Sequence, residues 1–244
     1  RPSCRWNGTT AAVTSPKRPL DTSVALALVM LCASWGLQNV AIKLALPSIP
    51  PVIQMAIRSG GAALILWAYA RLRHPGPLVH WNANTAWGVL AGALFGIEFV
   101  AVFLGLGYTT ASRAVLFLYT APFFVALGGW FLLPGERLRP AQWLGLGLTF
   151  VAVALAMGAR VDLPGGTTLL GDGLSLFAGL CWGATTLLIK ASPLARKTSA
   201  QEILFYQLAM SAVICTSFAL FIGERITAIP TPVAWAAMAY ITIW

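Results

Sequence analysis

Eight apolar stretches occupy almost all of this chain from residue 23 onward. A helix needs about twenty apolar residues to cross the hydrocarbon core of a bilayer, and most of these stretches have that length. Proline and glycine mark the gaps between them, as in Pro75-Gly76-Pro77. The expected spans cover residues 23–46, 52–70, 85–107, 114–133, 141–159, 171–190, 200–222 and 232 onward. We therefore predict an all-α integral membrane protein.

The composition excludes most soluble classes of protein. Charged residues make up 9% of the chain and hydrophobic residues 58%, whereas about a quarter of a soluble domain is charged. The net charge of +9 comes from short basic clusters between the spans, which form no basic face for nucleic acid. The four cysteines contain no C-x-x-C pair and both histidines share one loop, so we expect no metal site and no cofactor.

The distribution of basic residues predicts the orientation. If the N-terminus is cytoplasmic, ten bases lie on the inner side and three on the outer side, as the positive-inside rule requires. The inner bases are Arg1, Arg5, Lys17, Arg18, Arg71, Arg73, Arg137, Arg139, Arg196 and Lys197, and the outer ones are Arg113, Arg160 and Arg225. We expect a multi-pass protein of the plasma (inner) membrane with its N-terminus inside.

A short pattern repeats at a fixed offset of 147 residues. The pattern is Trp35-Gly36 followed by Ile42-Lys43, and it recurs as Trp182-Gly183 followed by Ile189-Lys190. The copies lie on the first and sixth spans, so five helices separate their starts and the copies cross the membrane in opposite directions. Such inverted repeats are typical of secondary transporters, whose binding sites lie near the middle of the membrane.

The repeat also predicts the domain boundaries. Residues 1–20 form a polar tail that is possibly non-native, residues 21–160 the first five-helix repeat, and residues 168–244 an incomplete second repeat. A complete second repeat would give ten spans and roughly 305 residues by the same offset. We therefore expect the chain to be truncated in about its eighth span, and the 244-residue form alone to be unable to transport.

Several motifs resemble the EamA-type proteins of the drug/metabolite transporter superfamily. The first-span motif runs from Trp35 to Lys43, and the others are Pro50-Pro51 with Arg58, Tyr108 to Arg113, Tyr119 to Phe123, and Pro134 to Leu138 running into Gln142 to Gly145. The resemblance covers about residues 22 to 244. It implies ten helices, both termini in the cytoplasm, and movement of small metabolites or drug-like solutes, commonly export, without fixing the cargo.

Two ionisable residues lie deep inside expected spans. Glu98 is near the centre of the third span and Arg58 near the middle of the second, and ionisable groups at such depth usually mark pathways or paired sites. One interpretation is a static Arg58–Glu98 ion pair that holds the two helices together. The other is a transport role, with Glu98 as a proton-linked carboxylate or a contact for a cation.

Polar and aromatic residues at mid-span form the candidate substrate site. Apolar walls with a few hydrogen-bonding groups are what a small-molecule site needs. Together with Arg58 and Glu98, the candidates are Trp35, Gln38, Asn39, Tyr119, Trp182, Thr185, Thr186, Tyr206 and Gln207. Lys43 and Lys190 are expected to reach toward the membrane interface, and Glu202 to be solvated at a helix end.

Backbone features suggest how the helices pack and move. Pro122 lies in the middle of the fourth span, where it removes a backbone hydrogen bond and produces either a hinge or a static bend. Small residues recur every four positions in the third and sixth spans and predict close helix packing. These stripes are Gly88, Gly92 and Gly96, and Gly171, Ser175, Gly179 and Gly183.

The leading functional prediction is a secondary transporter of a small metabolite or drug-like solute, an exporter that works by alternating access, with Glu98 as the candidate for proton coupling. The chain has no G-x-x-x-x-G-K-[ST] phosphate loop. A channel or a non-transporting membrane scaffold is the alternative. A membrane-embedded enzyme is less favoured because both histidines lie in a loop. The sequence leaves the oligomeric state open.

Overall fold

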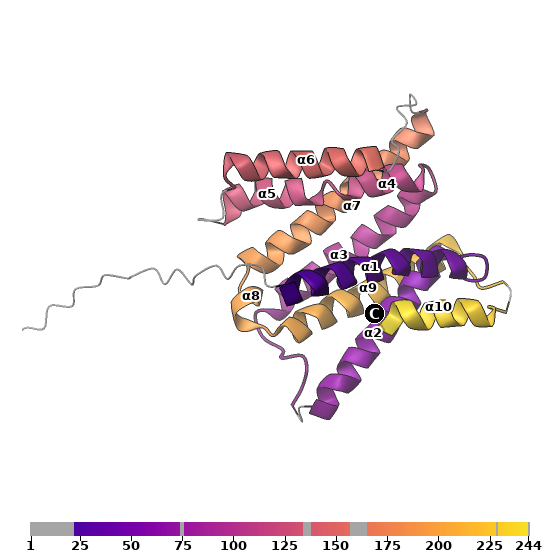
Figure 1. The fold of residues 1–244 in the computed structure, drawn as a ribbon. Helices are drawn as coiled ribbons and strands as arrows, with labels where there is room; N and C mark the ends of the chain where they lie inside the picture. The colour runs from indigo at the N-terminus through magenta and orange to yellow at the C-terminus, as the bar shows by residue number, and fades with distance from the viewer. Residues whose placement is uncertain (1–21, 74–75, 134–137, 157–164, 228, 244) are drawn as a thin grey trace, which may run out of the picture. The chain divides into compact units, whose positions relative to one another are not determined.

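A computed structural model describes residues 22–73, 76–133, 138–156, 165–227 and 229–243. These residues form helices and connecting segments, and no strand occurs among them. The helices are α1 (Thr22–Ala45), α2 (Pro51–Arg73), α3 (Thr85–Leu106), α4 (Ala111–Leu118), α5 (Ala121–Leu132), α6 (Pro140–Ala156), α7 (Gly166–Ala191), α8 (Leu194–Lys197), α9 (Ala200–Ile222) and α10 (Pro232–Ile243). Figure 1 labels each of them.

Five segments of the described chain are long and apolar enough to cross a membrane, which confirms an all-α membrane protein. They are Pro51–Arg73, Thr85–Leu106, Ser112–Leu132, Gly166–Ala191 and Ala200–Ile222. Shorter apolar helices cover Thr22–Ser34, Pro140–Leu155 and Pro232–Ile243. The helices therefore follow the expected spans closely.

Local sequence explains where several helices begin and end. Proline is tolerated in the first turn of a helix, and Pro51, Pro140 and Pro232 begin α2, α6 and α10. The Ser199 side chain accepts a hydrogen bond from the Glu202 amide and caps α9. Gly223 ends α9 at φ 73°, a left-handed conformation that glycine adopts without a steric penalty.

The fourth expected span is divided into α4 and α5 at Tyr119 and Thr120. Pro122 follows in the first turn of α5 and has no amide hydrogen to donate to the preceding turn. The Thr120 amide bonds to the Phe117 carbonyl, and the Thr120 hydroxyl donates to the same oxygen at 2.6 Å. The interruption therefore lies just before the proline that predicted it.

The chain divides into two parts, residues 1–39 and residues 40–244, and each is described by itself. In the first part, Thr22–Asn39 forms the beginning of α1. In the second part, α3 packs against both α7 and α9, α2 packs against α9, and α4 and α5 pack against α7. Figure 1 labels these helices, so that their packing within the second part can be seen.

Small residues allow these helices to approach closely. A Cβ added at Gly92 of α3 would lie 2.8 Å from the Met210 Cβ of α9, and one at Gly183 of α7 would lie 2.8 Å from the Phe124 Cβ of α5. Such distances leave no room for a side chain, which confirms the close packing that the small-residue stripes predicted.

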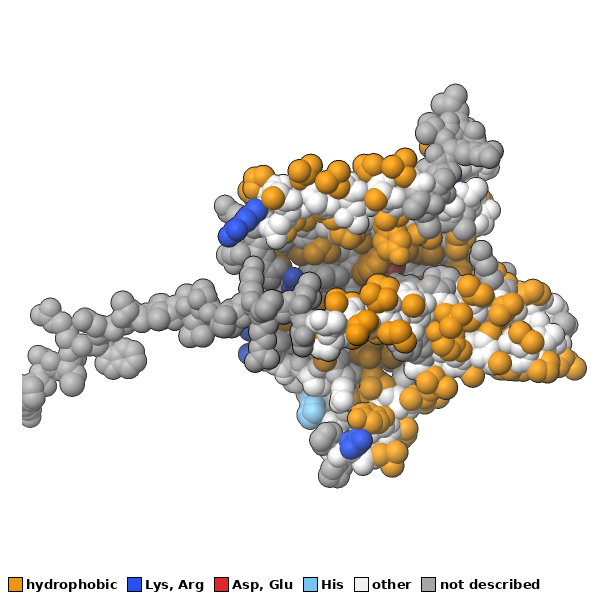
Figure 2. Space-filling model, in the orientation of Figure 1, with side chains coloured by type: hydrophobic (Ala, Val, Ile, Leu, Met, Phe, Trp, Pro, Cys, Tyr) orange, Lys and Arg blue, Asp and Glu red, His pale blue; other side chains and the backbone are white. Residues whose placement is uncertain are grey.

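The outward face of α6 is apolar. Leu144, Leu148, Val151 and Leu155 are all exposed, and Leu155 reaches 76% exposure. Figure 2 shows this row of hydrophobic side chains along α6 at the upper edge of the view. A contiguous apolar row of this kind is unfavourable in water and fits a helix that faces lipid.

Candidate solute site

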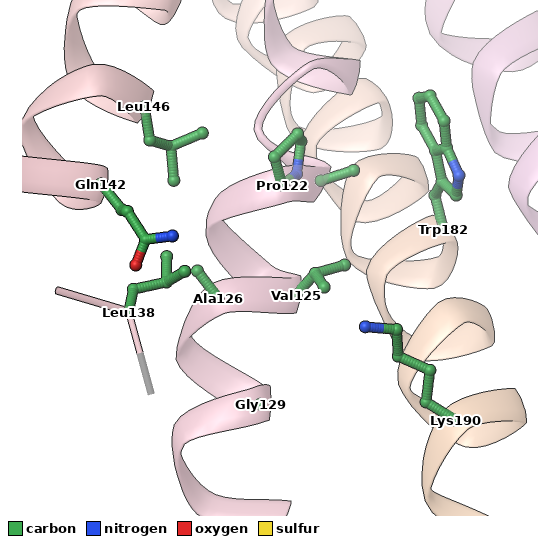
Figure 3. Close-up of a pocket in the computed structure, with 10 residues that line it drawn as sticks. Pro122, Val125, Ala126, Gly129, Leu138, Gln142, Leu146, Trp182 and Lys190 are labelled. Atoms are coloured by element: carbon green, nitrogen blue, oxygen red, sulfur yellow. The ribbon is translucent and has the colours of Figure 1, made fainter. Parts of the chain in front are cut away.

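A cavity of about 550 Å³ lies between α5, α6 and α7, all within the second part of the chain. Cavities of this size accommodate small molecules. The lining is largely apolar, and no acidic residue is among its members. They are Ala121, Pro122, Val125, Ala126, Gly129, Leu138, Gln142, Leu146, Trp182 and Lys190, most of which are labelled in Figure 3.

The cavity runs from one end of these helices toward their middle. Gly129 lies in the last turn of α5, Gln142 in the first turn of α6 and Lys190 in the last turn of α7, so these residues mark one end of the bundle. Pro122 and Trp182 line the part nearer the middle. Trp182 therefore lies deeper than Lys190 and Gln142, and apolar residues line the cavity along its whole length.

Trp182 and Tyr119 meet beside the interruption of the fourth span. Their ring centroids are 6.4 Å apart with the planes at 45°. Trp182 lines the cavity and Tyr119 contacts Trp182 across the boundary between α4 and α7. Two of the predicted substrate-site residues, Trp182 and Tyr119, thus lie with Pro122 at the interruption between α4 and α5.

Gly179 lets α7 fit against the backbone at this interruption. A Cβ added there would lie 2.9 Å from the Leu118 carbonyl oxygen and 3.1 Å from the Phe117 carbonyl oxygen. Since Pro122 cannot donate to the preceding turn, the carbonyls of Phe117 and Leu118 face a glycine rather than a side chain. The interruption and the stripe of small residues are therefore parts of one interface.

Lys190 and Gln142 supply the polar side chains of the cavity. Figure 3 shows the Lys190 amine pointing from α7 toward α5, and the Gln142 amide pointing from α6 toward the same helix. Lys190 was expected to reach the membrane interface, and the structure places it in the cavity lining.

An ion pair joins α4 to α7 at the opposite end from this opening. Arg113 Nε donates to Asp172 Oδ1 at 3.1 Å, and Arg113 Nη2 donates to Asp172 Oδ2. The Thr109 hydroxyl also donates to Asp172 Oδ1, at 2.8 Å. The Asp172 side chain is only 6% exposed. Sequence reasoning missed this cluster, although Asp172 lies within an expected span; an acid within an apolar stretch was the available signal.

Glu98 and Arg58 do not form the ion pair that was one of the two interpretations of these residues. Glu98 is buried on α3, and its Oε2 has no hydrogen-bond partner among the described residues. Arg58 Nε instead donates to the Ile241 carbonyl oxygen at 3.2 Å, and the guanidinium lies 5.8 Å from the centre of the Phe99 ring. Glu98 remains a buried carboxyl group on the helix that packs against α7.

Tyr206 lies away from the cavity, at the start of α9. Its hydroxyl donates to Glu202 Oε1 and to the Thr85 hydroxyl, each at 3.4 Å. Glu202 is buried rather than solvated, and it also accepts a hydrogen bond from the His80 amide at 3.0 Å. Tyr206 is therefore outside the lining of this cavity and its role in solute binding stays a prediction, and its neighbour Gln207 is half-buried on the same helix.

The remaining candidates have separate surroundings. The hydroxyls of Thr185 and Thr186 donate to the carbonyls of Cys181 and Trp182 one turn earlier in α7. Gln38 is buried on α1. The side chains of Trp35, Asn39 and Lys43 lie outside the described part of the structure, although their backbone belongs to α1.

The sequence pattern of the EamA-like transporter family matches residues 22–158. An uncharacterized transporter of Archaeoglobus fulgidus is 28% identical over 232 residues, which are 91% of this chain and 75% of that protein. The uncharacterized transporter YvbV of Bacillus subtilis is 26% identical over 83% of this chain and 63% of its own length. A riboflavin transporter of Rhizobium johnstonii is 31% identical over 99 residues, which are 41% of this chain and 30% of that protein.

A solved crystal structure has a similar fold. Its TM-score is 0.65 at 21% sequence identity, over 87% of this chain and 74% of that chain. At this identity the likeness concerns the fold alone.

Proposed function

This chain belongs to the EamA-like transporter family and is a multi-pass membrane transporter, and from that premise we propose that it exports a small solute by alternating access through the cavity between α5, α6 and α7. The family match and the names of the relatives point to transport rather than to catalysis. One relative is named as a transporter of riboflavin, a small solute.

The observation that carries this proposal is the asymmetry along α7. At the end of α7 that holds Lys190, a cavity lies between α5, α6 and α7. At the end that holds Asp172, the pair with Arg113 ties α7 to α4. A solute could enter from the first end and reach Trp182, while the second end is closed. Alternating access requires such a state and its opposite.

The interrupted fourth span supplies a point at which the two ends can move separately. Helix α4 is held to α7 by Arg113, whereas α5 packs on α7 through Gly128 and Leu187. Between them the helix is interrupted at Tyr119 and Thr120. We propose that Pro122 makes this interruption a hinge rather than a static bend.

We further propose that the N-terminus is cytoplasmic in the plasma (inner) membrane, as the basic residues predict. The end of the bundle with Leu138, Gln142 and Lys190 then faces the cytoplasm, and the cavity is open to the inside. Residues 21–160 and 168–244 would form the two repeats, with the second one crossing the membrane in the opposite direction.

Glu98 is the proposed coupling group. Its carboxyl group is buried and one of its oxygens lacks a hydrogen-bond partner among the described residues. A carboxyl group in such surroundings can exchange a proton when solute or water reaches it, which would link transport to a pH gradient. Glu98 lies on α3, which packs against α7, the helix that contributes Trp182 and Lys190 to the cavity.

The test is solute movement in proteoliposomes that contain the full-length protein, with and without an imposed pH gradient. Radiolabelled amino acids and metabolites serve as solutes, and Glu98→Gln is compared with Glu224→Gln. Glu224 accepts a hydrogen bond from the Ile53 amide at 3.1 Å, which glutamine can also accept. We expect saturable, gradient-driven transport that Glu98→Gln loses and Glu224→Gln keeps.

Transport that persists in Glu98→Gln with the same response to the pH gradient would be consistent with a transporter, but it would show that Glu98 is not the coupling group. Non-saturable flux of solute down its gradient would instead indicate a channel and contradict alternating access.

A further inference from the structure

We propose that the protein binds an anionic phospholipid where α2 ends beside α9, with the lipid phosphate at Arg71 and part of an acyl chain along Trp67 and Leu64. This site shares no residue with the cavity between α5, α6 and α7, and the inference does not depend on the proposed transport. It comes from a second cavity that combines a base with apolar walls.

The second cavity has a volume of about 190 Å³ and lies between three elements. Helix α2 contributes Trp67 and Arg71, α9 contributes Phe205, and the segment before α3 contributes residues 77–79. Arg71 is the charged residue of this lining, which contains no acid among the residues that the structure describes. The cavity therefore suits a ligand with an anionic group and an apolar part.

Arg71 is positioned by the aromatic ring one turn earlier on α2. Its guanidinium carbon lies 5.6 Å from the centre of the Trp67 ring, a cation–π contact. Both residues are exposed, so the cavity opens to the surface of the protein. A guanidinium presents its N–H donors in a planar fork that matches the oxygens of a phosphate.

The wall formed by residues 77–79 is fixed to α9 through His80. The His80 amide donates to Glu202 Oε1 at 3.0 Å, and His80 Nδ1 lies 3.5 Å from Glu202 Oε2. Glu202 also accepts a hydrogen bond from the Tyr206 hydroxyl at 3.4 Å. The carboxylate one turn before Phe205 is therefore engaged by His80 and Tyr206, and it is not part of the cavity wall.

The surface beside the cavity is apolar. Leu64, Trp67 and Arg71 are spaced by three and four residues, so they share one face of α2. Leu64 is 68% exposed, and Leu72, which follows Arg71, is 86% exposed. Leu64 lies about 10 Å from Arg71 along the helix axis. This face therefore runs from a base at the helix end to an apolar surface further along the helix.

A phosphate on a soluble molecule would offer the same chemistry to Arg71, and we commit to the lipid. Pockets that enclose a whole small molecule measure about 300 Å³ or more, whereas this cavity measures about 190 Å³ and takes only part of a ligand. The remainder of the ligand would lie on exposed apolar surface, which suits an acyl chain in the bilayer. Basic pockets between membrane helices are typical sites for anionic headgroups.

Arg73 provides a matched control for Arg71. It lies in the same last turn of α2, and its guanidinium carbon is also 5.6 Å from the centre of an aromatic ring, that of Tyr69. The positive-inside rule accounts for both bases equally. Arg73 is not among the residues that line the cavity. The two arginines therefore differ in their relation to the cavity and not in their charge.

The experiment is native mass spectrometry of the full-length protein, released from micelles with equal amounts of dioleoyl phosphatidylglycerol and dioleoyl phosphatidylcholine. The ionic strength is set to screen distant charges. We expect the anionic lipid to be retained in preference. Arg71→Ala should lower this preference about fivefold, the factor that one base beside anionic lipid contributes. Arg73→Ala should leave it unchanged, and Arg71→Lys should keep most of it.

A second pair of variants tests the place of the acyl chain. Trp67→Ala should weaken retention of both lipids, because their chains are the same. Tyr69→Ala is the control, since Tyr69 is 47% exposed, close to the 46% of Trp67, and does not line the cavity. Unfolding temperatures in lipid-free detergent show that each variant is folded. If Arg71→Ala is not, Arg71→Gln replaces it in the comparison.

Four outcomes would overturn the inference. Equal retention of the two lipids would remove the preference for an anion, and equal effects of Arg71→Ala and Arg73→Ala would assign it to diffuse surface charge. Displacement of phosphatidylglycerol by glycerol 3-phosphate would assign the site to a soluble phosphate. Equal effects of Trp67→Ala and Tyr69→Ala would contradict the place of the chain. Each of these results leaves the proposed transport standing, because solute movement is measured separately.

Discussion

Arg113 and Asp172 lie 59 residues apart in the sequence and form a two-pronged ion pair between α4 and α7. Arg113→Ala would leave the Asp172 carboxylate, which is 6% exposed, without its cation. Removing one partner of a buried pair costs about 3–5 kcal/mol. We therefore expect Arg113→Ala to lower the free energy of unfolding by about that amount, as measured by denaturant unfolding in detergent micelles.

The double variant Arg113→Ala with Asp172→Asn is the control, since it removes the charge that the single variant leaves buried. It should be more stable than Arg113→Ala alone. Equal unfolding midpoints for Arg113→Ala and the unmodified protein would mean that the pair contributes nothing to holding α4 on α7.

The sequence predicted some residues of the candidate site and not others. Trp182, Tyr119 and Pro122 were found from the repeat and from their depth within spans, and the structure brings them together. Tyr206 is outside the cavity lining, and its hydroxyl points back to Glu202 at the start of α9. Pairs such as Arg113 with Asp172 depend on which helices are neighbours, and one sequence does not contain that information.

The close packing of α3 against α9 predicts that a larger residue at their contact destabilises the protein. A Cβ at Gly92 of α3 would collide with the Tyr206 carbonyl oxygen and lie 2.8 Å from the Met210 Cβ of α9. Gly92→Ala should therefore destabilise the protein by about 1–3 kcal/mol, as overpacked cores do. Gly147→Ala is the matched control, because Gly147 lies in α6 with nothing within 4 Å of an added Cβ. Alanine there should be neutral or stabilise by up to about 1 kcal/mol.

Thermal unfolding in the same detergent distinguishes the two glycines. Equal transition temperatures for Gly92→Ala and Gly147→Ala would show that α3 and α9 can separate without a penalty, and would contradict the packing described here.

Helix boundaries were the most predictable part of the fold. Proline and glycine end or begin helices for steric reasons that act locally, so the starts of α2, α6 and α10 agree with the expected spans. Helix α7 begins at Gly166, five residues before its expected start, so more than one additional turn precedes Asp172. The partners of Asp172, Arg113 and Thr109, are not revealed by any local pattern.

The side of the membrane to which the cavity opens is a property of the whole molecule, because it depends on how the helices are oriented in the bilayer. The asymmetry between the open end at Lys190 and the closed end at Asp172 is fixed by the helices. The compartment that the open end faces depends on the orientation of the chain in the membrane, which the distribution of basic residues predicts. A labelling experiment can therefore connect the cavity to a compartment without knowing the solute.

Single cysteines in loops at the two ends of α9 test the orientation in intact cells. Cys4, Cys32, Cys181 and Cys215 are first replaced, and Ala195→Cys or Thr227→Cys is then added at positions that are exposed in the structure. With a cytoplasmic N-terminus, a membrane-impermeant maleimide should label Thr227→Cys directly and Ala195→Cys only after the membrane is permeabilised. The cysteine-free protein is the control. The reverse pattern would place Lys190 and the cavity opening outside the cell, and would contradict the proposed cytoplasmic N-terminus and inward-open state.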